Sequence, residues 1–436
     1  MTSSSVTLSD MLDARERRAR MQADLLNGTD GSCCLVSLSL NIAGDVKRTR
    51  KTRLLFDRGL KLFDMLGFSE RKRVVTDAKT GTEALILLSE NAAAVKAALE
   101  RVEDAFPAAR LYDFDVLNAQ GEKLSRSEPR TCLVCGGHAA VCARSRAHGL
   151  DAVKAKTDAL LNDFCADTLA YTAHFALLRE LHTTPKPGLV DERNTGAHTD
   201  MDVPLFLKSA AALVPYFQEA VLLGMQNAGM PPLKAAGLEA ERAMFSATGG
   251  VNTHKGAIYS MGLLLYGMGA ALETGADAIE TAAALAQTDA DVRLRHAKGA
   301  RDTNGAKVFA AFGAKGAVGE AANGFPAARF CADRLLLYGE TEHAGALALC
   351  DVMATLFDTN LLHRGGEEGL RFVQDESRRI AALPLSERAA ALFALDDALI
   401  KRNLSPGGAA DMLALGYLIL AWRELSATLT LSEERL

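Results

Sequence analysis

The segment RLYDFDVL, residues 110–117, alternates in a way that is typical of a β-strand with one buried face. Side chains two residues apart point to the same face of a strand, so Asp113 and Asp115 should lie together. Two adjacent carboxylates repel each other unless a cation joins them, and Mg²⁺ takes hard oxygen ligands. We therefore predict a Mg²⁺ site for phosphate chemistry, with an exposed strand face or helix-capping aspartates as the alternative.

Helix and strand patterns are mixed on both sides of this segment, which indicates an α/β fold for residues 1–150. We expect helices over 7–26, 52–66 and 92–106, and strands over 34–42, 74–77, 83–88 and 111–117. From residue 151 the strand signal fades, and long helical patterns follow at 151–181, 204–228, 255–273, 276–286, 344–358 and 408–425. Residues 151–436 are therefore predicted to form an all-α domain, with the boundary between 148 and 165, inside a continuous helix.

Composition excludes several classes of protein. The 436 residues are 49% hydrophobic and 24% charged, which provides for a large core and rules out wholesale disorder. A net charge of −5 argues against a nucleic-acid-binding protein that relies on a global positive field. No apolar run is long enough to be a signal peptide or a membrane span, and eight cysteines are too few for a disulfide scaffold. We expect a cytoplasmic protein with reduced thiols, with neither nucleic acid nor a membrane as partner.

Cations and thiols follow the acidic strand. Arg110, Arg126 and Arg130 are candidates for binding a polyphosphate. Further on, the sequence carries five candidate zinc ligands: Cys132, Cys135, His138, Cys142 and His148. Their spacing matches no standard zinc finger, so we predict thiols that pack in the interior, with a zinc site as the alternative.

The helical half carries five polar clusters in its loops and at its helix ends. Asn360, His363 and Arg364 would share one helix face, and the Gly-Gly-Val-Asn-Thr-His-Lys run at 249–255 would present backbone N–H groups to an anion. The candidate phosphate-binding residues are Lys186, His198, Asn252, His254, Lys255, Lys315, Asn360, His363, Arg364 and Ser405. The candidate catalytic carboxylates are Asp191, Asp200, Glu320 and Asp358, with Asp411 as a further Mg²⁺ ligand or general base; Asp191, Asp200 and Asp358 are also candidate metal ligands.

These motifs resemble two enzyme families. TPKPGLVDERNTGAHTDMD (184–202), TGGVNTHKGAIYSMGLL (248–264), GAKGAVGEAANGFP (313–326), FDTNLLHRGG (357–366) and LSPGGAADMLA (404–414) resemble triphosphoribosyl-dephospho-CoA synthase. RLYDFDVL and PRTCLVCGGHAAVCARSRAH (129–148), with Gly121 and Arg126, resemble the phosphoribosyl-dephospho-CoA transferase that loads the citrate lyase acyl carrier subunit. The resemblance implies a bifunctional fusion with a nucleotidyltransferase-like first domain.

The resemblance also implies two consecutive reactions. The helical domain would join ATP to 3′-dephospho-CoA and release adenine. Four of its side chains would lie near the phosphates of these substrates: Lys186, His254, Lys255 and Arg364. The first domain would transfer the phosphoribosyl-dephospho-CoA unit to a serine of the apo acyl carrier (gamma) subunit and release pyrophosphate, with Mg²⁺ on Asp113 and Asp115. Three alternatives stay open: the equivalent pair for malonate decarboxylase, a non-catalytic nucleotide or CoA sensor, and, last, a metal-dependent phosphohydrolase.

Overall fold

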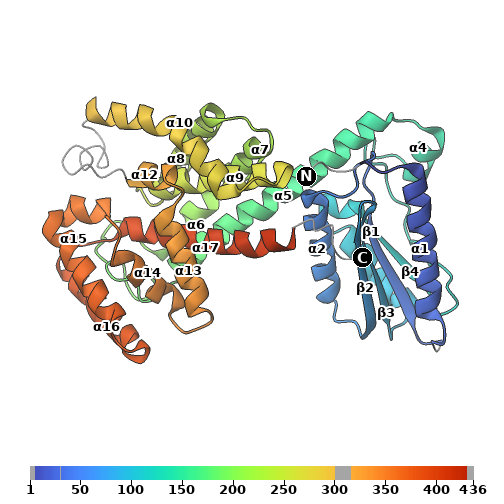
Figure 1. Cartoon of the computed structure of the whole chain (residues 1–436), viewed down its shortest axis with the longest axis horizontal. Helices are drawn as coiled ribbons and strands as arrows, with labels where there is room; N and C mark the ends of the chain where they lie inside the picture. Colours follow the sequence, from blue (N-terminus) through green and yellow to red (C-terminus); the bar gives the residue numbers. More distant parts are fainter. Residues whose placement is uncertain (1–4, 30, 300–315, 430–436) are drawn as a thin grey trace. The chain divides into compact units, whose positions relative to one another are not determined.

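A computed structural model describes residues 5–29, 31–299 and 316–429 of the chain (Figure 1). The chain divides into two compact units. Unit 1 comprises residues 1–165 and 429–436, and unit 2 comprises residues 166–428. The division falls within one long helix, α5 (Leu150–Leu181).

Unit 1 is built on one antiparallel sheet in the order β2-β3-β1-β4. Its strands are β1 (Cys34–Leu40), β2 (Glu70–Ala78), β3 (Gly81–Leu88) and β4 (Tyr112–Leu117). Helix α1 (Leu8–Leu26) packs on one face, and α2 (Arg50–Asp64) with α3 (Ala92–Glu103) covers the other (Figure 1). A 3₁₀ turn, η1 (Pro107–Leu111), leads into β4. The mixed fold predicted for this part is confirmed, with a sheet that is antiparallel throughout.

Side chains close the first part of the outer edge of β4, and a backbone bond from the Leu124 N–H to the Val116 carbonyl, at 2.8 Å, closes its end. Lys96 donates to the Phe114 carbonyl at 2.9 Å, and the Phe114 N–H donates to Glu103 at 2.9 Å. Both side chains are buried on α3. Glu103 in turn pairs with Arg126 and Arg130 at 2.6 and 2.7 Å. These bonds satisfy the edge groups that would otherwise invite pairing with another chain.

The segment between β4 and α5 contains one short helix, α4 (Ala139–Ser145), which buries no side chain. No hydrophobic residue of 118–149 belongs to the core. Cys135 is exposed, and Cys132 and Cys142 are half-buried. The prediction of interior packing thiols is therefore wrong, because this segment has no interior for them to fill.

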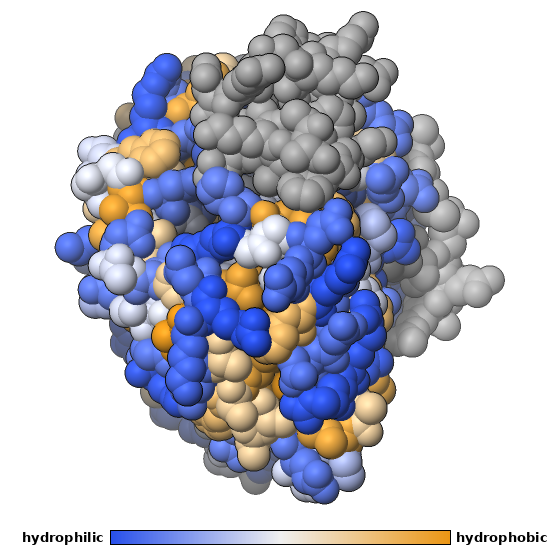
Figure 2. Space-filling view, turned by 90° about the vertical axis from the view of Figure 1, so that its left-hand side faces the viewer, coloured by the Kyte–Doolittle hydropathy of each residue, from blue (hydrophilic) through white to orange (hydrophobic). Residues whose placement is uncertain are grey.

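In its described residues, unit 2 contains helices joined by loops and no strand. After α5 it contains α6 (Val203–Ala212), α7 (Val214–Met225), α8 (Met230–Ala247), α9 (Lys255–Thr274), α10 (Ala278–Gly299), α12 (Gly316–Ala322), α13 (Pro326–Tyr338), α14 (Ala344–Met353), α15 (Thr359–Ala381), α16 (Leu385–Lys401) and α17 (Gly407–Thr428). Figure 2 shows a face of this unit on which hydrophilic residues surround a group of apolar ones.

The centre of unit 2 is α9, which is buried along almost its whole length. It packs closely on α7 because glycines leave room. A Cβ on Gly224 would lie 2.0 Å from the Tyr266 carbonyl oxygen, and one on Gly269 would lie 2.1 Å from that of Val221. An apolar helix enclosed in this way needs no polar face.

The segment 204–228 differs from its prediction as a single helix. It forms α6 and α7, which meet at Leu213, because Pro215 has no N–H to continue the helix and instead begins the next one. Residues 203–225 together have the length and composition of a membrane span, which is weak evidence because the core helix of a globular protein passes the same test.

Candidate functional site

A cavity of about 720 Å³ opens in unit 2 and is lined from six parts of its sequence. It brings together eleven of the predicted residues: Lys186, His198, Asn252, His254, Lys255, Glu320, Asp358, Asn360, Arg364, Ser405 and Asp411. These residues are separated by up to 225 positions in the chain, from Lys186 to Asp411, so the convergence is a property of the tertiary fold.

Four helices begin at this cavity, one of which, α15, is kinked at Gly366. The first residues of α9, α13, α15 and α17, namely Lys255, Pro326, Thr359 and Gly407, all line it. A helix N-terminus carries a partial positive charge and unpaired N–H groups. Together with the cationic side chains of Lys186, Lys255 and Arg364, these ends make the cavity suited to a polyanion.

Asp358 joins two of these helix ends. Its Oδ1 accepts from the N–H groups of Asn360 and Leu361 at the start of α15, at 2.8 and 3.3 Å. Its Oδ2 accepts from the N–H of Ala409 in α17 at 2.9 Å. Burial raises the pKa of this carboxyl, and the backbone bonds act against that rise. A metal ion here would have to displace these bonds. Asp358 is therefore better suited to holding the starts of α15 and α17 in place than to binding a metal.

Glu320 plays a similar part at α13 but keeps one oxygen available. Its Oε1 accepts from the N–H groups of Ala327 and Ala328 at 2.6 and 3.2 Å. Burial raises its pKa. Among the described residues, no hydrogen bond to Oε2 is found, which leaves this oxygen for a ligand in the cavity.

A buried ion pair forms part of the cavity wall. Lys186 Nζ lies 2.5 Å from Glu180 of α5, and the two side chains are only 2% and 7% exposed. The sequence pattern did not single out Glu180, which lies inside an ordinary helical stretch. Its charge partner, six residues away, is the only signal that could have identified it.

The loop that carries Lys186 is held by two buried aspartates. Asp191 accepts from the backbone N–H groups of Lys186, Arg193 and Asn194 at 2.8–3.1 Å. Asp396 of α16 accepts from the N–H of Gly188 at 2.8 Å and pairs with Arg193 at 2.7 Å. Both oxygens of Asp191 are therefore engaged, and this residue does not line the cavity.

Asp411, near the start of α17, is a cavity carboxyl whose pKa is strongly raised. Burial, and then the negative charges of Glu180 and Asp358, raise its pKa to about 8. Its Oδ2 lies beside Gly256 of α9, where an added Cβ would stand 2.3 Å from it. A carboxyl that is protonated near neutral pH can donate a proton, which an ordinary aspartate cannot do.

His198, Ser405 and Arg364 form a hydrogen-bonded chain. Arg364 donates to His198 Nδ1 at 3.2 Å, and His198 Nε2 lies 2.8 Å from Ser405 Oγ. Because a guanidinium can only donate, Nδ1 must accept and the imidazole proton lies on Nε2. Burial and the charge of Arg364 lower the pKa of His198, which keeps the ring neutral.

His254 is the second neutral imidazole of the cavity. Its Nδ1 lies 2.6 Å from the Ser209 hydroxyl of α6, and the ring packs edge-on against Phe206. Burial, and then the charge of Lys186, lower its pKa to about 3. The ring can therefore form hydrogen bonds with a ligand without bringing a charge of its own.

The remaining predicted residues of this half fall into three groups. Asn252 accepts from the backbone N–H of Lys255 at 3.3 Å, and Lys255 Nζ pairs with Glu241 at 2.9 Å, so these two cavity residues already have partners. Asp200 and His363 are exposed and do not line the cavity. Lys315 lies outside the described residues.

In unit 1, Asp113 and Asp115 do share a face of β4. They pair in register with Ser39 and Ser37 of β1, and both are half-buried between the buried Tyr112, Phe114 and Val116. Lys123 lies 2.5 Å from Asp115. Two carboxylates with adjacent hydroxyls are hard oxygen donors, so this face fits Mg²⁺ chemically.

The three arginines near this strand are already hydrogen-bonded. Arg126 and Arg130 pair with Glu103 as described above, and Arg110 donates to Thr131 Oγ1 at 2.6 Å. Each therefore has a role in holding the segment after β4 against the sheet. An incoming phosphate would compete with these bonds.

Comparison with known proteins finds a match to both units. Residues 166–429 match the family model described as ATP:dephospho-CoA triphosphoribosyl transferase, and residues 6–164 match that of apo-citrate lyase phosphoribosyl-dephospho-CoA transferase. Protein CitXG of Haemophilus influenzae is 36% identical over 96% of this chain and 97% of its own length. Protein CitXG of Leuconostoc mesenteroides is 31% identical over 94% and 96%. The 2-(5''-triphosphoribosyl)-3'-dephosphocoenzyme-A synthase of Haemophilus ducreyi is 37% identical over 66% of this chain.

Proposed function

Because the chain belongs to the proteins that fuse an apo-citrate lyase phosphoribosyl-dephospho-CoA transferase to an ATP:dephospho-CoA triphosphoribosyl transferase, we propose which residues perform each reaction. The chain is a bifunctional transferase. One reaction converts ATP and 3′-dephospho-CoA into 2′-(5″-triphosphoribosyl)-3′-dephospho-CoA and adenine. The other transfers the phosphoribosyl-dephospho-CoA unit to a serine of the apo acyl carrier subunit and releases pyrophosphate.

The cavity of unit 2 is the proposed site of the first reaction. At C1′ of the ATP ribose, the bond to adenine breaks and a bond to the 2′-oxygen of dephospho-CoA forms. The 2′-hydroxyl must lose a proton, and adenine must gain one. Asp411, protonated at neutral pH, donates the proton to adenine, and Glu320 accepts the hydroxyl proton through Oε2. Exchange with solvent restores both carboxyls.

The triphosphate is the proposed ligand of the helix ends. The N-termini of α9, α15 and α17 face the cavity beside Lys186 and Arg364, so a chain of phosphates would meet N–H groups and cations together. His254 and the His198–Ser405 pair add neutral donors and acceptors for the riboses.

Asp113 and Asp115 are the proposed Mg²⁺ ligands of the second reaction. The cation would neutralise charge on the phosphate under attack and on the departing pyrophosphate. Lys123 adds a positive charge at the same face. We also propose a nucleotidyltransferase-like fold for unit 1, on the strength of paired carboxylates on a strand of a small sheet, and the cytoplasm as the compartment.

The observation that carries the assignment of the synthase site is Asp411, a carboxyl of raised pKa in a cavity rich in phosphate-binding groups. It is tested with the purified full chain, ATP, Mg²⁺ and 3′-dephospho-CoA, by measuring adenine release and the mass of the product. Asp411→Asn should lower adenine release by about 10²–10⁴-fold. A variant with unaltered turnover would overturn the assignment.

Transfer to the carrier is tested with the same preparation after apo citrate lyase carrier is added. Asp113→Asn and Asp115→Asn should abolish carrier loading and leave adenine release unchanged, whereas Glu122→Gln, an exposed acid on the adjacent hairpin, should affect neither. Apo malonate decarboxylase carrier serves as the competing acceptor. Faster loading of that carrier would favour the malonate decarboxylase system, although the family match of residues 6–164 names citrate lyase.

A further inference from the structure

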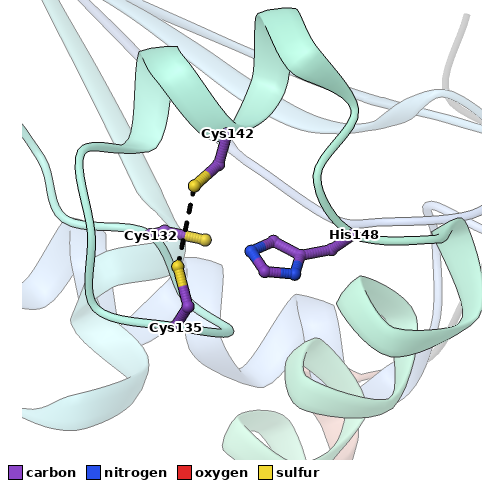
Figure 3. Close-up of side chains that lie close together, drawn as sticks. All are labelled: Cys132, Cys135, Cys142 and His148. Carbon is purple, nitrogen blue, oxygen red and sulfur yellow. Dashed lines mark hydrogen bonds between the residues drawn. The ribbon is translucent and has the colours of Figure 1, made fainter.

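Four metal-binding side chains converge in the segment that follows β4, although neither reaction uses them. Cys132, Cys135, Cys142 and His148 each offer a ligand atom, and these atoms all lie within 4.8 Å of one another (Figure 3). In the part of the chain that the structure describes, no other group of three or more His, Cys, Asp or Glu residues meets this criterion.

The distances match a tetrahedral zinc site. Zn–S bonds of about 2.3 Å at tetrahedral angles place two sulfurs about 3.8 Å apart. Cys135 Sγ and Cys142 Sγ lie 3.6 Å apart, close to that value and well beyond the ~2.0 Å of a disulfide. Three thiolates and one imidazole are a common ligand set for structural zinc.

The backbone around the first two cysteines has the form of a metal-binding turn. The Val134 N–H donates to Cys132 Sγ at 3.4 Å, and the Gly136 N–H donates to the Cys132 carbonyl at 3.0 Å. Gly136 has a positive φ of 73°, which a residue with a side chain rarely adopts. The turn brings both sulfurs to the same side, where they meet Cys142 of α4 (Figure 3).

His148 provides an independent indication of a ligand. Its Nε2 is buried and has no hydrogen-bond partner among the described residues. A buried polar nitrogen without a partner loses the free energy of about one hydrogen bond, roughly 1–3 kcal/mol. Coordination of a metal would satisfy this nitrogen.

Packing gives the physical reason for a metal at this point. Residues 118–149 contribute no side chain to the hydrophobic core, and α4 buries none. A folded segment without a core is usually held by a metal or a disulfide. We propose that Cys132, Cys135, Cys142 and His148 bind one structural Zn²⁺, which replaces a core in this segment.

The site would also support the acidic strand. Thr131 accepts a hydrogen bond from Arg110 at 2.6 Å, and Arg130 donates to the Tyr112 carbonyl at 2.9 Å. The turn that holds the metal is thereby attached to the residues on either side of the start of β4, next to Asp113. Loss of zinc should therefore loosen the transferase face of unit 1 and leave the cavity of unit 2 unaffected.

The test is zinc content of the full chain purified under reducing conditions, by elemental analysis. We expect about one zinc per chain, lost in Cys142→Ser and His148→Ala and kept in His138→Ala, a matched exposed histidine outside the cluster. Adenine release, which depends on unit 2, verifies that unit 2 stays folded in each variant, and retained zinc in His138→Ala verifies that an exposed substitution in this segment does not by itself empty the site.

A second measurement uses the unmodified chain, in case the variants fail to fold. A thiol-modifying reagent should release zinc to a chromophoric chelator, and Co²⁺ exchanged into the site should show the intense absorption of tetrahedral thiolate coordination. A chain without bound zinc that does not take up Co²⁺ would overturn the proposal. So would zinc retained in Cys142→Ser, or a Cys135–Cys142 disulfide found in peptides from the reduced preparation.

Discussion

Replacing Asp411 by asparagine should stabilise unit 2 while it removes synthase activity. In the native protein the pKa of Asp411 is about 8, against an ordinary value of 3.8. The folded state therefore holds a proton that the unfolded chain releases as pH rises above about 4. Between the two pKa values, the free energy of unfolding falls as pH rises. Asp411 does not lower the stability of the fold below pH 3.8. Its destabilising effect grows as pH rises and is largest above pH 8.

The size of this destabilisation follows from the number of pH units between the ordinary pKa of 3.8 and the pH of the experiment. Each pH unit between 3.8 and 7 corresponds to about 1.4 kcal/mol for one proton, so the loss at pH 7 is at most about 4 kcal/mol. Asparagine has nearly the same shape and carries no charge, so it avoids this loss. For a unit of this size, each kcal/mol raises Tm by about 2–4 °C. We expect a rise of at least ~3 °C.

The assay is scanning calorimetry of the full chain at pH 6, 7 and 8, beside adenine release. The gain in Tm over the unmodified chain should grow with pH. Glu424→Gln, an exposed acid-to-amide change on the same helix, should show no such gain. If Asp411→Asn lowers Tm at pH 8, or leaves adenine release unaltered, the reasoning about this carboxyl is refuted.

Three further substitutions probe other contacts. Arg364→Lys keeps the charge but cannot reach both Ala197 and His198, so KM for ATP should rise about tenfold or more, which steady-state kinetics would measure; an unaltered KM would exclude Arg364 from binding. Gly256→Ala places a Cβ 2.3 Å from Asp411 Oδ2 and should reduce adenine release but not carrier loading from preformed 2′-(5″-triphosphoribosyl)-3′-dephospho-CoA; equal losses in both assays would indicate misfolding instead. Glu103→Gln removes the negative charge that pairs with Arg126 and Arg130 and should destabilise unit 1 by about 3–5 kcal/mol in urea denaturation, with adenine release as the internal control.

Local patterns predicted well where a single element is enough to place a side chain. The alternation of 111–117 put Asp113 and Asp115 on one face of a strand. Asn360 and Arg364 do lie together at the start of α15. These features depend on backbone periodicity and on local stereochemistry, which a short sequence contains in full.

Contacts that depend on how loops and helices pack together could not be predicted. Asp358 and Asp191 read as candidate metal ligands, yet their oxygens bind backbone N–H groups of helix ends and of a loop. Glu180 was not recognised, because an acid inside a helix gives no sign of the lysine that it meets. His148 and His138 looked equivalent, and only the path of the chain around α4 brought His148 to the thiols.

The sequence by itself determined the two kinds of fold, the acidic strand and the set of polar loops, because periodicity and motif spacing are local properties. Only the tertiary structure decided which residues share the cavity and what state each is in. The pKa of Asp411 depends on burial and on Glu180, which is 231 positions away, and the neutral form of His254 depends on burial and on Lys186. Desolvation and charge act through space, so the chemistry of these groups exists only once the chain has folded.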